Sequence, residues 1–191
     1  AQHFRDKGWN HTIFQCYQNN KNNFKQNGWS RGSSPWLLDE PANFQDYWAL
    51  RYFADAFHEG VRAVPGAAQQ VKLCYRGDIS RPEWQRDALD HVLDYNVVGG
   101  GAFTKYHRLV MLRKERFGHI VVPYGTTNAI EASNMQPVGW SLDSWTRGGD
   151  GVLPWQTIGR AESWKDADQL SLFYPGSSIG QEEPIPSIRL K

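Results

Sequence analysis

Two adjacent acidic residues, Asp39 and Glu40, are the strongest candidates for chemistry in this sequence. They follow a short apolar segment, Trp36–Leu38, and stand directly before Pro41. Neighbouring side chains along a strand point to opposite faces, so both carboxyl groups can face one cavity only if the strand has ended by Glu40. Pro41 favours that ending, because proline lacks a ladder donor and restricts the residue before it.

Two carboxyl groups this close can divide the work of acid–base catalysis. Their repulsion raises the pKa of at least one, and such a group can donate a proton near neutral pH. Ordinary glycosidases hold their two acids about 5–9.5 Å apart with the sugar between them. Adjacent acids cannot straddle a ring, but they fit a substrate-assisted reaction in which the sugar's own 2-acetamido oxygen attacks the anomeric carbon. Asp39 would then hold the acetamido N–H, and Glu40 would protonate the leaving oxygen.

The same spacing also fits a purely structural role. Asp39 could cap the following helix while Glu40 makes a surface ion pair, since a bare Asp-Glu-Pro is a weak motif. Glu131 offers a further alternative: as a remote second carboxylate it would restore an ordinary two-acid mechanism, although it also fits a solvated loop.

Strand-like apolar segments alternate with helical patterns along the chain. Asn43 and Asp46 stand in capping-box positions before a helix that we expect to end near Gly66. A second helix is expected to begin at Ser80, and a third spans Tyr106 to Phe117. The expected strands are Thr12–Tyr17, Trp36–Leu38, Val71–Tyr75, Val92–Val98, His119–Tyr124 and Gly151–Gln156. This alternation predicts parallel strands and the α/β class.

A doubly wound sheet and a (β/α)8 barrel are the two candidate architectures. No expected strand leads into GxGxxG or a Walker loop, which disfavours the nucleotide-binding form of the first. Several strands end in polar or aromatic side chains, as they do around a barrel's active site. A whole barrel takes about 250 residues, and this sequence has 191. We therefore predict a TIM-barrel-like fold with about six βα units and the first two strands missing, forming one domain over residues 1–191.

Side chains at or near the expected strand ends are candidates for binding a sugar. Aromatic rings can stack on sugar rings and amides can bind hydroxyls, although each of these residues also fits a core, rim or loop position. Arg76 and Asp78 are expected to form a structural ion pair, and Gly99–Gly101 to allow close backbone approach. The predicted substrate-binding residues are Tyr75, Asn96, Tyr124, Trp155 and Gln156.

Composition and charge argue against several classes of partner, namely nucleic acid, membrane and metal ions. The formal net charge is +1, from 21 basic and 20 acidic residues, so no charge pattern indicates nucleic acid. No apolar run approaches the roughly 18–20 residues of a membrane span. Cys16 and Cys74 are expected to be buried structural thiols, and the six histidines form no metal-binding motif. The sequence thus predicts a carbohydrate partner with neither metal nor cofactor.

Two segments, "WLLDEPANFQDYWALRYF" and "DQLSLFYPGSSIGQEEPIPSIRLK", resemble glycoside hydrolase family 123 and the related domain of unknown function 4091. The resemblance implies a β-N-acetylgalactosaminidase-like enzyme with a (β/α)8 barrel and an adjacent Asp-Glu pair in a substrate-assisted mechanism. That pair corresponds to Asp39 and Glu40. The likeness covers the middle and end of the family's barrel, while its first strands and added β-sandwich have no counterpart here.

A second hypothesis belongs to another class of protein. A barrel that lacks strands could be a non-catalytic carbohydrate-binding or scaffold remnant. An incomplete barrel exposes two sheet edges, which proteins usually pair or cover. We therefore expect the chain either to form a homodimer through those edges or to need a further segment that covers them.

Overall fold

The computed structural model describes residues 1–191 except 22–23, 26–33, 127–131, 156, 167–170 and 188–191. The chain divides into two compact units, Ala1–Val121 and Val122–Lys191. Within the described ranges, no helix is both long and apolar enough to cross a membrane.

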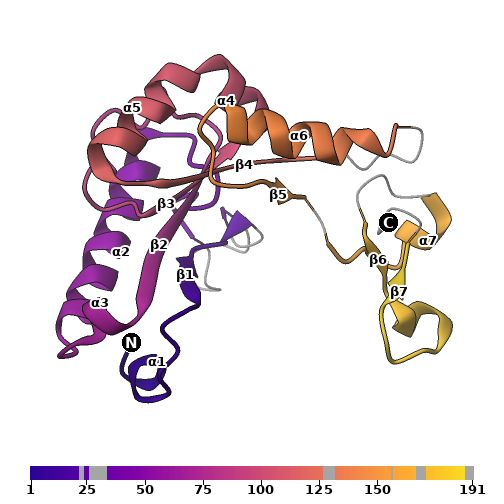
Figure 1. Ribbon diagram of the computed structural model, residues 1–191, viewed down its shortest axis with the longest axis horizontal. Coiled ribbons are helices and arrows are strands. Elements are labelled where there is room, and N and C mark those ends of the chain that lie inside the picture. The colour runs from indigo at the N-terminus through magenta and orange to yellow at the C-terminus, as the bar shows by residue number, and fades with distance from the viewer. Residues whose placement is uncertain (22–23, 26–33, 127–131, 156, 167–170, 188–191) are drawn as a thin grey trace. The chain divides into compact units, whose positions relative to one another are not determined.

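The main sheet is parallel (Figure 1), and its strands are hydrogen-bonded in the order β1-β2-β3-β4-β5. Tyr17 lies opposite Arg76 in the β1–β2 ladder, and Asp78 lies opposite Val97 in the β2–β3 ladder. The prediction of an α/β class is confirmed. The strands are β1 (Ile13–Tyr17), β2 (Lys72–Ile79), β3 (Tyr95–Gly99), β4 (Ile120–Gly125) and β5 (Leu153–Pro154).

The prediction of an incomplete (β/α)8 TIM-barrel-like fold with six βα units is wrong, because the parallel sheet has five strands among the residues that the structure describes. The expected strand at Trp36–Leu38 does not form. The Leu37 N–H donates to Asp46 Oδ1 at 2.9 Å, and the Leu38 N–H donates to Asn20 Oδ1 at 2.9 Å. Two side chains have thus taken the backbone donors that a ladder would need.

The helix expected from Ser80 is also missing, and the crossover from β2 to β3 is a series of turns. Arg113 explains the difference. Its guanidinium reaches over from a later helix and donates to the carbonyl oxygens of Pro82, at 2.8 Å, and Arg86. These carbonyls are therefore held by a tertiary contact and not by an i to i+4 ladder.

The longest helix, α2 (Phe44–Arg62), begins as predicted. Asn43 is its N-cap, and Asp46 Oδ2 accepts the Asn43 N–H at 2.8 Å in the expected capping box. In the first unit, the short α1 (Gln2–Asp6) precedes α2. The helices that follow α2 are α3 (Ala67–Gln70), α4 (Gly100–Lys105) and α5 (His107–Phe117). The second unit contains α6 (Met135–Thr146), α7 (Ser163–Asp166), a 3-10 turn at Gly176–Ile179 and the antiparallel pair β6 (Phe173–Tyr174) and β7 (Ile185–Pro186).

The close approach that we expected within the glycine run is not found at Gly101. Gly99 is the N-cap of α4 and the next two glycines form its first turn, where a side chain at Gly101 would meet nothing within 4 Å. The close approach occurs at Gly77 in β2, where an added Cβ would lie 2.9 Å from Leu93 Cδ1.

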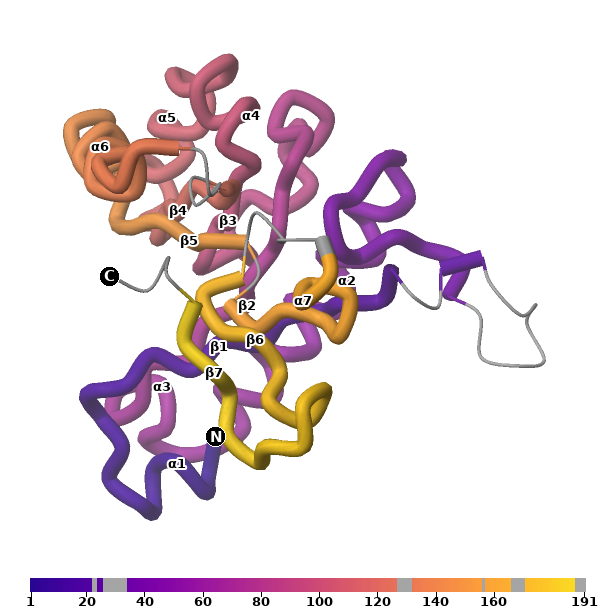
Figure 2. The backbone as a smooth tube through the Cα atoms, turned by 90° about the vertical axis from the view of Figure 1, so that its right-hand side faces the viewer, coloured from indigo at the N-terminus to yellow at the C-terminus, as the bar shows by residue number. Residues whose placement is uncertain are grey.

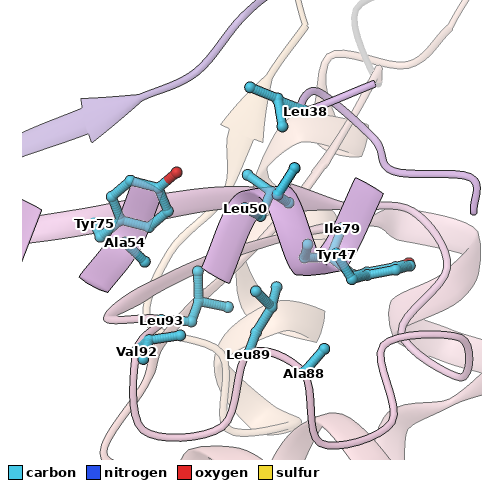
Figure 3. Close-up of a cluster of buried hydrophobic side chains, with 11 residues drawn as sticks. Leu38, Tyr47, Leu50, Ala54, Tyr75, Ile79, Ala88, Leu89, Val92 and Leu93 are labelled. Carbon is cyan, nitrogen blue, oxygen red and sulfur yellow. The ribbon is translucent and has the colours of Figure 1, made fainter. Parts of the chain in front are cut away.

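The two faces of β2 differ in character, and this difference positions the candidate site. Tyr75 and Ile79 point into a core shared with α2, which includes Leu50 and Ala54 (Figure 3). Since side chains alternate along a strand, Arg76 and Asp78 lie on the opposite face. The helix-covered face is therefore apolar, whereas the other face brings charged groups to the carboxyl end of β2.

Candidate functional site

The backbone at Glu40 brings the two adjacent acids to the same side. Its φ is 56°, in the left-handed region that residues with a Cβ seldom occupy. Its N–H donates to the Asp78 carbonyl oxygen at 3.1 Å, which ties the acid pair to the end of β2. Both carboxylates reach one ammonium group: Lys21 Nζ lies 2.6 Å from Glu40 Oε2 and 3.5 Å from Asp39 Oδ2. The cluster of Asp39, Glu40, Lys21, Tyr17, Arg76 and Asp78 is called the acid pair site below.

The carboxyl ends of β1 and β2 supply the rest of the acid pair site. The hydroxyl group of Tyr17, the last residue of β1, acts on Asp39 and lowers the pKa of its carboxyl group. The Arg76 guanidinium lies over the Tyr17 ring, 4.3 Å from its centroid. It also donates to both carboxylate oxygens of Asp78, at 2.7 and 2.9 Å, so the predicted ion pair is confirmed. Five charged groups and one phenol thus gather at the carboxyl ends of two neighbouring strands.

Burial sets the electrostatics of Asp39, which is 4% exposed. Loss of solvent raises the pKa of this carboxyl, and the negative charges of Asp78 and Glu40 add to the rise. The Tyr17 hydrogen bond and the Lys21 charge oppose it. Burial also raises the pKa of Tyr17, helped by the charges of Asp78 and Asp39, so its hydroxyl remains a hydrogen-bond donor.

Lys21 is the cation that holds the two acids together. Its partial burial lowers the pKa of the ammonium group, but the hydrogen bond to Glu40 and the charges of both acids raise it by more. The shorter of its two contacts, at 2.6 Å, is with the Glu40 carboxyl group.

The purely structural interpretation of the acid pair is met only in part. Asn43, not Asp39, caps α2. Glu40 does make an ion pair, but with the same lysine that Asp39 contacts, so the two acids form one cluster.

Two of the predicted substrate-binding residues lie on the helix-covered face of the sheet. Tyr75 is 1% exposed and packs against Phe57 of α2, with ring centroids 5.8 Å apart. Asn96 is also buried and lies opposite Gly77 in the ladder, which puts its side chain on the same face as Tyr75. Neither side chain shares the face that carries Arg76 and Asp78.

The remaining predicted binding residues belong to the second unit. Tyr124 lies on β4 opposite Leu153, and Trp155 follows β5 with half of its surface exposed. The Trp155 N–H donates to the Gly125 carbonyl oxygen at 2.7 Å. Gln156 lies outside the described residues, as does Glu131, the alternative second carboxylate.

Sequence reasoning missed Tyr17 and Lys21. Tyr17 ends an expected strand, so the signal that selected the other strand-end aromatics was present there too. Lys21 stands in a long polar loop with no motif around it, and its contact with Glu40 spans 19 residues. Among the residues that the structure describes, no three His, Cys, Asp or Glu side chains are grouped to hold a metal ion.

Chemically, the acid pair site combines four kinds of group. They are the buried Asp39 carboxyl group with its raised pKa, the more exposed Glu40 carboxyl group, the Tyr17 hydroxyl group and the ammonium group of the long Lys21 side chain. These are the parts of acid–base chemistry on a polar substrate. Comparisons with family models, with curated proteins and with solved structures found no match to this chain.

Proposed function

We propose that the chain is a retaining, substrate-assisted glycoside hydrolase that acts on terminal 2-acetamido sugars of the β-N-acetylgalactosaminide type. One observation carries the proposal: Asp39 and Glu40 turn toward the same lysine although they are neighbours in sequence. The resemblance of the surrounding segment to glycoside hydrolase family 123 supports it. The left-handed backbone at Glu40 also supports it, because conformational strain of this kind clusters at functional sites.

The two acids take different roles because their surroundings differ. Asp39, buried and fixed by the Tyr17 hydroxyl, holds the acetamido N–H so that the acetamido oxygen points at the anomeric carbon. Glu40 is the more exposed acid, with 26% of its side chain accessible, and it gives its proton to the leaving oxygen. After the leaving group departs, Glu40 takes a proton from water, which then opens the cyclic intermediate with net retention.

Replacing Glu40 tests the assignment. On a 2-acetamido-β-galactoside with an alkyl leaving group, Glu40→Gln is expected to lower kcat by about 10²–10⁴-fold, the usual contribution of a general acid. On the 4-nitrophenyl glycoside the loss is expected to be much smaller, because nitrophenolate leaves without a proton. Equal kcat for the wild type and Glu40→Gln on the alkyl glycoside would remove the proposal.

Two controls sharpen this experiment. Glu59→Gln makes the same substitution at an exposed position of α2 and is expected to leave kcat unchanged. The matching 4-nitrophenyl β-galactoside, which lacks the acetamido group, is expected to be a poor substrate for the wild type. Hydrolysis at the same rate would contradict the participation of that group.

A second candidate is a non-catalytic carbohydrate-binding or scaffold protein derived from such an enzyme. The ion pair between Lys21 and Glu40 favours it, because it occupies the carboxylate that has to carry the proton. Saturable binding of N-acetylgalactosamine in calorimetry, with no hydrolysis of the 4-nitrophenyl glycoside, would identify this alternative.

A further inference from the structure

A pocket of about 800 Å³ opens at the amino ends of the strands in the first unit. Its wall includes the starts of β1 and β2, the end of α2, and residues of α1 and α3. Figures 1 and 2 both show α1 beside α3 at this end of β2. The acid pair site lies at the other, carboxyl ends of β1 and β2, and neither acid lines the pocket. Its volume falls within the range of about 300–1,000 Å³ that small-molecule sites occupy.

Positive charge dominates the pocket wall. Arg5, Arg62, Lys72 and His58 line it, and Asp94 is its one carboxylate. That carboxylate is already engaged: Asp94 Oδ2 lies 3.2 Å from His58 Nε2 and accepts the Tyr75 N–H at 2.7 Å. Asp94 therefore does little to neutralise the other three cations.

Two of these cations, Arg62 and Lys72, form no ion pair within the described part of the chain. Arg62 extends from the last turn of α2, and Lys72 is the first residue of β2. Unpaired basic side chains are common on a surface, but here they line one concavity together with the amides of Asn10, Gln69 and Gln70.

Arg5 is held in position at the pocket wall. Its Nη1 donates to the Pro65 carbonyl oxygen at 2.7 Å, and Nε and Nη2 both donate to Asp6 Oδ1. A guanidinium group has five N–H donors, so two remain for a ligand. A fixed fork of this kind suits planar or tetrahedral oxyanions, which guanidinium groups bind through two parallel hydrogen bonds.

We propose that this pocket is a binding site for a small oxyanion, carried by a ligand with a phosphate or carboxylate group. Arg62 and Lys72 supply the unpaired charge, Arg5 supplies oriented donors, and the three amides bind the uncharged remainder. The proposal is independent of glycoside hydrolysis, because it concerns the opposite end of the strands.

Isothermal titration calorimetry with the whole chain tests the site, using pyrophosphate in one arm and citrate in the other at matched ionic strength. We expect saturable binding of at least one probe, and the tighter one identifies the oxyanion. In Arg62→Gln/Lys72→Gln the affinity for that probe is expected to fall by at least about 100-fold, since each charged hydrogen bond contributes roughly a factor of ten or more.

Arg108→Gln/Lys105→Gln is the matched control. It removes an arginine and a lysine from exposed positions of α5 and α4, which do not line the pocket, and is expected to bind like the wild type. Binding of neither probe at millimolar concentration would overturn the proposal. So would equal weakening in both double variants, because that result would show a response to net charge alone. Circular dichroism confirms that each variant is folded.

Discussion

At the scale of single residues, the left-handed backbone of Glu40 is the feature on which the acid pair site depends. A residue with a Cβ loses roughly 1–2 kcal/mol in this conformation, whereas glycine does not. We therefore expect Glu40→Gly to be more stable than Glu40→Ala by about 1 kcal/mol in urea unfolding. Both variants lose the carboxylate and its contact with Lys21, so the comparison isolates the backbone.

The same pair of substitutions at Asp55 provides the control. Asp55 lies inside α2, where glycine is expected to be less stable than alanine by about 1 kcal/mol. The order of stability should thus reverse between the two positions. An alanine variant at position 40 that equals or exceeds the glycine variant would contradict the left-handed conformation.

The acid pair could be found from the sequence, but its mechanism of assembly could not. We expected the carboxyl groups to converge because a strand ended at Glu40, whereas Trp36–Leu38 form no strand and the positive φ of Glu40 turns the chain instead. Tyr17 and Lys21 join Asp39 across 22 and 18 residues of chain, respectively. No local pattern encodes such contacts, because they depend on how β1 lies beside β2.

At the scale of elements, local signals succeeded where the deciding contacts are local. The α2 helix begins where Asn43 and Asp46 predict, because both capping partners lie within one turn. The segments around Leu37 and Pro82 were mispredicted because side chains distant in sequence, Asn20 and Arg113, capture their backbone groups. Tertiary hydrogen bonds therefore overrode apolar pattern and capping signals.

The contact between α2 and the start of β3 should make stability depend on pH. The hydrogen bond to Asp94 raises the pKa of His58 in α2, and the Val92 carbonyl oxygen adds to this effect, against the burial that lowers it. A raised pKa in the folded state stabilises the fold below the unfolded value of about 6.5 and loses that stabilisation as pH rises through the folded value. The free energy of unfolding should therefore fall above pH 6.5, by up to about 1 kcal/mol for a partly exposed pair.

Comparison with His58→Gln isolates this contribution. The difference in unfolding free energy between the wild type and His58→Gln is expected to shrink between pH 6.5 and pH 8.5. His3→Gln, an exposed change in α1, should run parallel to the wild type. Burial lowers the pKa of His119, so that residue destabilises the fold below pH 6.5 and does not act in the same window. A constant difference for His58→Gln would show that the ion pair does not form.

At the scale of the whole molecule, the alternation of strands and helices predicted the α/β class and the parallel pairing. It did not predict the number of strands, because a barrel and an open sheet share the same local patterns. The two compact units and the five-stranded sheet follow from long-range contacts. β1 is the strand at one end of the sheet's strand order. The exposed edge that we expected therefore remains a prediction, and β1 is the strand that would form it.

Pairing of β1 with a second copy is the expected use of this edge, because an unpaired strand presents a row of free backbone donors and acceptors. Light scattering should give twice the chain mass of 21.9 kDa at high concentration. Gln15→Lys puts a charge on the exposed side of β1 and should shift the mass toward the monomer, as edge lysines do. Gln136→Lys, the same change at an exposed position of α6, should leave the mass unchanged. A monomer at every concentration, or equal dissociation by both variants, would contradict pairing through β1.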